Sequence, residues 1–237
     1  MRNSLAIARR ELGSHYASPL AYVVTSAFLV ICGVFFYLNL AYGQQATISP
    51  IVQTVLTILL LISPVFSMRL LSEEQRSGTL ELLLTAPVRD YEVVVGKYLA
   101  GFTLVGVMLL LTLLYPALLF AFGSPDVGAV VGGYLAMLLF AGASVAIGLF
   151  ASSLTQNQIV AAVLAFAILL VLWVMDGVGQ MIGGPAGPIL GYLGLYPHFG
   201  DLTRGVIDTK DVVYYLSLIA VPLFLTTRAL EARRWRG

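Results

Sequence analysis

Residues 98–122 read YLAGFTLVGVMLLLTLLYPALLFAF, a stretch of 25 residues without a charged side chain. An α-helix needs roughly 20 apolar residues to cross a hydrocarbon core of about 30 Å, so this stretch is long enough to span a membrane. Over the whole chain, 59% of residues are hydrophobic and only 11% are charged, whereas a soluble domain carries roughly 25% charged residues. These observations predict an all-α integral membrane protein.

Similar apolar stretches predict six membrane-spanning helices within a single domain, residues 1–237. The predicted spans are residues 20–42, 51–71, 98–122, 129–150, 159–175 and 212–227. Pro64 is expected to kink the second span. The last span is short and contains Pro222, but Asp211 and Arg228 bracket its apolar run, so we retain it.

The first residues, 1–19, predict an interfacial helix. Four residues of mostly apolar character fall on one helical face, and arginines lie at its rim. These four residues are Leu5, Ala8, Leu12 and Tyr16. The alternative is a disordered basic tail.

The distribution of Lys and Arg predicts the orientation in the membrane. Eleven of these residues fall on the side of the two termini and of the charged segment 72–97, whereas the opposite side holds Arg204 and Lys210. Positively charged loops stay in the cytoplasm, so both termini and residues 72–97 are expected there.

Residues 177–211 are predicted to face outward and to be neither a plain span nor a plain loop. Nine glycines and three prolines interrupt this apolar sequence. Two interpretations remain open: a pair of re-entrant half-helices, or a compact apolar loop on the membrane surface. Gly183, Gly187 and Gly191 repeat at four-residue spacing, which allows close backbone approach and is consistent with a gate or with ordinary helix packing.

The sequence lacks the residues of several other classes of membrane protein. No ionisable residue lies in the middle of a predicted span, which argues against an ion-coupled transporter. An intramembrane serine protease would need a base near its nucleophile, but the only histidines, His15 and His198, lie outside the spans. His-Cys metal clusters are absent from the sequence as well, so no catalytic, cofactor-binding or metal-binding residue is assigned. Around Gly96 and Lys97, the loop G-x-x-x-x-G-K-[ST] lacks its first glycine and its final hydroxyl residue. The chain is therefore not expected to be an enzyme, and its net charge of +1 gives no general basic surface for nucleic acid.

The charged segment 72–97 contains a predicted short surface helix. Gly78 breaks the helix that leaves the second span, and Thr79 can cap a new one. Glu81 then suits the positive end of the helix dipole, and Pro87 stops the helix. Its apolar side consists of Leu80, Leu83 and Leu84. This side can dock in a groove of a partner or lie on the protein's own bundle.

Residues 74–87, EQRSGTLELLLTAP, resemble the E-x-x-x-G-T-L-E-x-L-L-x-x-P signature of ABC transporter permeases of the type-2 exporter class. Two further stretches, residues 146–160 and residues 204–212, resemble the subgroup of gliding-motility-associated permeases. The resemblance extends over nearly the whole chain.

This resemblance implies an N-terminal connecting helix, re-entrant external helices before the last span, a homo- or heterodimer of permease subunits, and two cytoplasmic ABC ATPase subunits. It favours docking of the short helix on the ATPase, and ATP and Mg are then expected on that partner rather than on this chain. The residues expected to couple the two subunits are Glu74, Gly78, Thr79, Leu80, Glu81, Leu83, Leu84 and Pro87. The expected location is the inner, cell membrane of a bacterium.

The predicted function is the membrane-spanning subunit of an ATP-driven exporter. Spans poor in charge argue against a small ion as substrate and are compatible with lipids, amphiphiles or saccharide-linked lipids. A mechanotransmitting or assembly subunit that passes no substrate is one alternative, and an energy-independent channel or scaffold is another.

Overall fold

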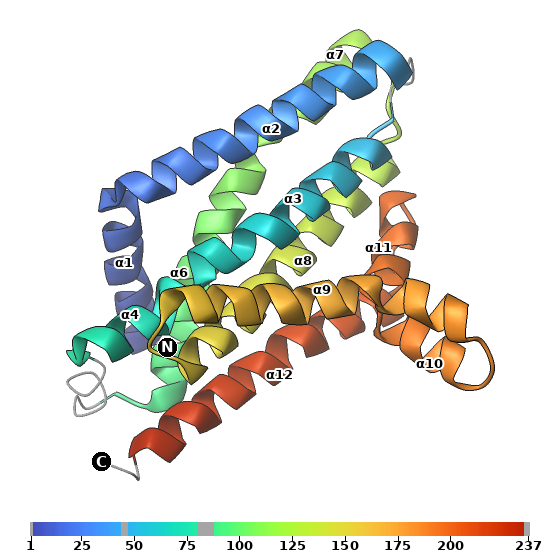
Figure 1. Cartoon of the computed structure of the whole chain (residues 1–237). Coiled ribbons are helices and arrows are strands. Elements are labelled where there is room, and N and C mark those ends of the chain that lie inside the picture. Colours follow the sequence, from blue (N-terminus) through green and yellow to red (C-terminus); the bar gives the residue numbers. More distant parts are fainter. Residues whose placement is uncertain (1, 44–46, 80–87, 235–237) are drawn as a thin grey trace.

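The computed structural model describes residues 2–43, 47–79 and 88–234, and the regular structure in these ranges is entirely helical. Six stretches are long and apolar enough to cross a membrane, which confirms the predicted fold class. Figure 1 shows the helices, whose bounds are α1 Arg2–Ala17, α2 Pro19–Gly43, α3 Ser49–Ser67, α4 Arg69–Ser77, α6 Asp90–Leu111, α7 Leu114–Phe122, α8 Val127–Leu154, α9 Gln158–Ile182, α10 Ala186–Leu193, α11 Leu195–Thr203 and α12 Thr209–Arg234.

The second spanning stretch is divided into α3 and α4 at Met68, four residues beyond the predicted kink at Pro64. Met68 N still donates to Pro64 O at 2.9 Å, so the helical bonding continues through the junction. Ser67 Oγ donates back to Ser63 O at 2.8 Å. Such a serine bond within a helix commonly bends it, which accounts for the position of the turn.

The third spanning stretch differs from the prediction at both ends. Its first helix, α6, begins at Asp90 rather than at residue 98, because Glu92 Oε2 accepts from Arg89 N at 3.3 Å and closes the first turn. The helix is then interrupted by a turn at residues 112 and 113, before α7 begins at Leu114. Pro116 explains this break, because its ring clashes with the carbonyl group four residues earlier. One predicted span is therefore two consecutive helices.

The fifth span is longer than predicted. Helix α9 continues from residue 175 to Ile182, so residues 177–182 are part of the same helix. Gly179 within this extension lies against α10, and this tertiary contact stabilises a glycine in a helix despite its low propensity. Helices α10 and α11 then form the end of the molecule opposite to the C-terminus (Figure 1).

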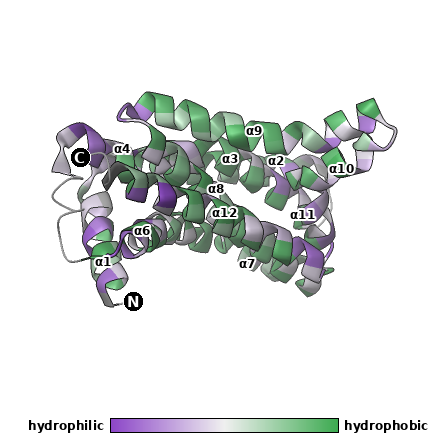
Figure 2. Ribbon diagram, turned by 90° about the horizontal axis from the view of Figure 1, so that it is seen from below, coloured by the Kyte–Doolittle hydropathy of each residue, from purple (hydrophilic) through white to green (hydrophobic). Residues whose placement is uncertain are grey.

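Helix α8 is the centre of the bundle. It packs on α3, α6, α9 and α12, and 78% of its most apolar window is buried, against 17% for α9. Its small residues allow this: a Cβ added at Gly133 would lie 2.7 Å from Val52 Cγ2, and one added at Gly142 would lie 2.9 Å from the Tyr98 hydroxyl. Figure 2 shows that hydrophobic residues run along the bundle while hydrophilic residues gather toward its ends, as expected in a bilayer.

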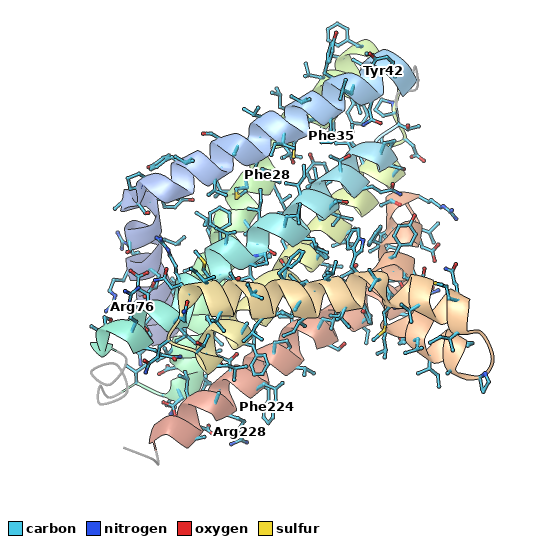
Figure 3. All side chains as sticks on the ribbon, viewed as in Figure 1. Phe28, Phe35, Tyr42, Arg76, Phe224 and Arg228 are labelled. Carbon is cyan, nitrogen blue, oxygen red and sulfur yellow. The ribbon has the colours of Figure 1, made fainter. Side chains whose placement is uncertain are left out.

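Helix α2 contacts the bundle along one side only. Figure 3 shows Phe28 pointing from α2 toward the other helices. Phe28 is fully buried, whereas Phe35 and Tyr42 farther along the helix are exposed. Most of α2 therefore offers an apolar surface to its surroundings.

The contact between α8 and α3 is expected to tolerate no additional methyl group at Gly148. A Cβ there would overlap the Ser67 side chain, so Gly148→Ala should cost about 1–3 kcal/mol of stability. Adding Ser67→Gly to Gly148→Ala should restore most of it. Gly106→Ala on α6 is the matched control, because its Cβ meets nothing within 4 Å. Melting temperatures of the purified chains in detergent measure this, and equal values for the two single variants would contradict the packing.

Candidate functional site

The signature residues of the charged segment start on α4. Gly78 ends α4 in a left-handed conformation with φ of 73°, which suits glycine and agrees with its predicted helix-breaking role. The hydroxyl of Thr79 lies 2.8 Å from that of Ser77. The remaining predicted coupling residues lie outside the described residues: Leu80, Glu81, Leu83, Leu84 and Pro87. The docking helix therefore stays a prediction, and the structure shows how the chain before it is anchored.

A charged cluster around Lys97 joins three helices. The Lys97 side chain on α6 is 1% exposed, and its Nζ lies 2.9 Å from Glu74 Oε1 on α4 and 3.1 Å from Glu11 Oε1 on α1. Arg10 Nη2 lies 3.8 Å and 3.7 Å from the same two oxygens. A buried ammonium group is costly unless oppositely charged groups surround it, and the two carboxylates meet that need. The cluster therefore fixes α1, α4 and α6 relative to one another.

In the sequence, Lys97 marks the end of the charged segment 72–97 and receives no predicted coupling role. The signal was nevertheless present in the helical spacing. Val93, Ala100 and Leu104 are buried at four residues before, three after and seven after Lys97, so the lysine lies on the inner face of α6. A lysine on such a face needs an acidic partner, and Glu74 of the signature is the one it has on α4.

A second contact ties α4 to α8. Gln75 is buried, and its Nε2 donates to Ser152 O at 3.2 Å and to Ser153 O at 3.0 Å. Helix α8 ends at Leu154, so these carbonyl groups belong to its last turn, where the helix has no amide groups left to pair with them. Gln75 thus caps α8 and holds α4 against its end.

Of the three glycines considered as a gate, Gly183 lies at the junction of α9 and α10, whereas Gly187 and Gly191 lie within α10. Gly183 ends α9 with φ of 62°, and α10 packs back on α9. A Cβ added at Gly179 would lie 2.6 Å from Gly187 O and 2.8 Å from Gly191 N. The two backbones are therefore in direct contact, which favours the packing interpretation for Gly187 and Gly191.

At the same end of the bundle as α10, a buried histidine and aspartate join α11 to α12. His198 Nδ1 lies 2.7 Å from Asp211 Oδ1, and His198 Nε2 lies 2.8 Å from Tyr192 O on α10. Because a carbonyl oxygen only accepts hydrogen bonds, Nε2 carries a proton. Tyr214 stacks on the imidazole with 3.8 Å between ring centres. Because His198 bonds α11 to both α12 and α10, we interpret the His198–Asp211 pair as a structural clasp between these helices.

Removing one carboxylate from the Lys97 cluster is expected to cost more stability than removing the carboxylate and the lysine together. Glu74→Ala removes one of the two carboxylates at the buried ammonium group and should cost about 2 kcal/mol, less than the ~3–5 kcal/mol for a lone partner because Glu11 remains. Combining it with Lys97→Met should recover part of this stability, since the buried ammonium group that lost one of its two carboxylates is then absent. Glu231→Ala is the control: its exposed ion pair with Arg228 should matter by less than about 1 kcal/mol. Thermal unfolding of the purified chains tests this, and a double variant less stable than Glu74→Ala would contradict it.

Comparison with known proteins agrees with the membrane architecture. The sequence matches the family described as ABC-2 family transporter protein over residues 5–233, nearly the whole chain. No curated protein matches the chain at a significant level. Permeases of this family are transport subunits that work with an ABC ATPase in a membrane. With this match and six apolar stretches of spanning length among its described residues, the chain belongs to the ABC-2 transporter family, as the multi-pass membrane permease component of an ABC transporter.

Proposed function

We propose that this permease couples ATP hydrolysis on a separate subunit to the movement of a substrate across the membrane. The anchoring of α4 supports this most directly. Its last turn leads into the leucine-rich part of the signature, and the same helix is bound to α1 and α6 through Glu74 and to α8 through Gln75. A displacement of the signature segment would therefore reach the central helix of the bundle as well as its cytoplasmic rim.

The proposed assembly contains two ABC ATPase subunits, which bind ATP and Mg, and a second permease subunit, either identical or different. The proposal of a second permease subunit is supported by α2, α9 and α12, because contacts within this chain leave most of their apolar surface uncovered. The surface not covered by the second permease would face lipid. An apolar, lipid-like or amphiphilic substrate fits spans that carry so little charge.

The proposed orientation places both termini in the cytoplasm of a bacterium, with the chain in the cell membrane. Two features support it: α1, α4 and the C-terminal end of α12 lie at one end of the bundle (Figure 1), and Figure 3 shows Arg76 and Arg228 at that same end. Helices α10 and α11 then face outward. The resemblance of residues 146–160 to gliding-motility-associated permeases concerns the type of permease and assigns no behaviour to the organism.

A mechanotransmitting subunit is the second candidate function, and the external helices favour it. Helix α10 exposes Ile189, Tyr192 and Leu193, and the His198–Asp211 clasp links the helices beside it to α12. A movement of α12 could thus be transmitted through these helices to a protein outside the membrane, without passage of a substrate. Transport assays in vesicles, run beside ATPase assays, separate the two functions.

The orientation is testable by cysteine labelling in a Cys32→Ala background. Ser77 is exposed near the end of α4 and Asp201 is partly exposed on α11. An impermeant maleimide added to intact cells should label a cysteine at position 201 and spare one at position 77, and permeabilised cells should show both labelled. The reverse pattern in intact cells would invert the proposed topology.

The coupling role is testable at Leu83. If the predicted helix docks on the ATPase, Leu83→Asp places a charge in an apolar contact at a cost of several kcal/mol, on the order of the penalty for an unpaired buried polar group. Pull-down of the ATPase subunit and its stimulated turnover should both fall at least tenfold. Leu82→Asp is the matched control, because a neighbouring helical position about 100° away points elsewhere.

Both variants are compared at equal membrane abundance, and the permease without its partner serves as the blank. Wild-type binding and turnover in Leu83→Asp would show that the leucines face the protein's own bundle. ATP turnover by the isolated permease would contradict the separate-subunit proposal.

A further inference from the structure

A cleft lies between the junction of α1 with α2 and the junction of α3 with α4. Its volume is about 170 Å³, below the roughly 300–1,000 Å³ of a site that encloses a whole small molecule. Polar side chains line one part of it, namely Glu11, Ser14, Ser18, Arg69 and Glu73, and apolar side chains such as Phe66 line another. A cleft of this size and lining suits one end of an amphiphile rather than an entire polar ligand.

Arg69 is the residue in this cleft whose bonding is incomplete. Its Nε is buried without a hydrogen-bond partner, and its guanidinium group forms no ion pair with the described residues. By contrast, Lys97 and Arg10 both lie near Glu11 and Glu74. A buried N–H group without a partner is costly, so an acceptor bound in the cleft would stabilise it. A guanidinium group matches two oxygens of a phosphate at once.

The length of α3 suits a position of this cleft at the depth of the lipid headgroups. Helix α3 begins at Ser49, and the 20 residues from there to Arg69 rise about 30 Å, the thickness of the hydrocarbon core. On the other wall, polar α1 gives way to apolar α2 at Pro19. Both walls of the cleft therefore change from polar to apolar at the same place, as a membrane phospholipid does.

We propose that this cleft binds the headgroup of a membrane phospholipid, with Arg69 and the hydroxyl groups of Ser14 and Ser18 on its phosphate. Glu73 also lines the cleft and can receive the ammonium group of a zwitterionic headgroup such as phosphatidylethanolamine. The acyl chains would leave past Phe66 toward the exposed surface of α2. This lipid is a resident ligand, so the proposal goes beyond the transport function and needs no ATPase to be tested.

Native mass spectrometry of the full-length, delipidated chain in detergent tests the site with defined lipids. Wild type should retain dioleoylphosphatidylethanolamine at least tenfold more tightly than dioleoylglycerol, which has no phosphate. Arg69→Gln should remove this preference, and Arg69→Lys should keep part of it because the charge stays. Arg76→Gln is the matched control, since Arg76 is an exposed arginine at the other end of α4 and outside the cleft. It should bind like wild type.

A second variant keeps the test independent of any folding defect in Arg69→Gln. Glu73→Gln should weaken phosphatidylethanolamine several-fold and leave dioleoylphosphatidylglycerol unchanged, because only the first lipid carries an ammonium group. Retention of the lipid by a folded, monodisperse Arg69→Gln protein would overturn the site. Displacement of the lipid by millimolar inorganic phosphate would overturn the assignment to a lipid and point to a soluble anion.

Discussion

One buried ammonium group, that of Lys97, holds the cytoplasmic end of the structure together. Transferring it out of water costs several kcal/mol, and Glu11 and Glu74 offset this only while α1 and α4 stay in place on both sides of α6. Apolar helices in lipid have no hydrophobic reason to prefer one arrangement over another, so such a polar contact specifies their register. Near the same end, Gln75 extends this fixed arrangement to α8.

In the rest of the bundle, close packing rather than charge fixes the helices relative to one another. In lipid, helices associate through close contact, and α8 supplies it with small residues where α3 and α11 approach. Gly132 is one example, since any side chain there would overlap the carbonyl oxygen of Leu202 on α11. At the far end, the His198–Asp211 pair joins α11 to α12. The two ends are thus connected through α8, with a polar fastening at each.

The sequence predicts the fold class and the number of spans because apolar length is a local property. The bounds fail where packing against another helix decides them, as in the extension of α9, where Gly179 is stabilised by α10. The break before Pro116 could have been foreseen, since a proline acts within one helical turn. The role of Lys97 could be foreseen only in part: spacing places it inside, but its partners lie on other helices.

The nine residues of α4 carry polar groups in three directions. At about 100° per residue, Glu74 and Gln75 point about 100° apart and Arg69 points about 140° from Glu74. In two of these directions the side chains form short polar contacts: Glu74 with Lys97, and Gln75 with the end of α8. The third, toward the cleft, has no such bond to the described residues. If the signature segment pulls on α4, the bonded helices must follow it and the cleft is the side that can change shape. A lipid headgroup on Arg69 would then oppose or follow that change, so its occupancy and the coupling motion would be linked through one helix.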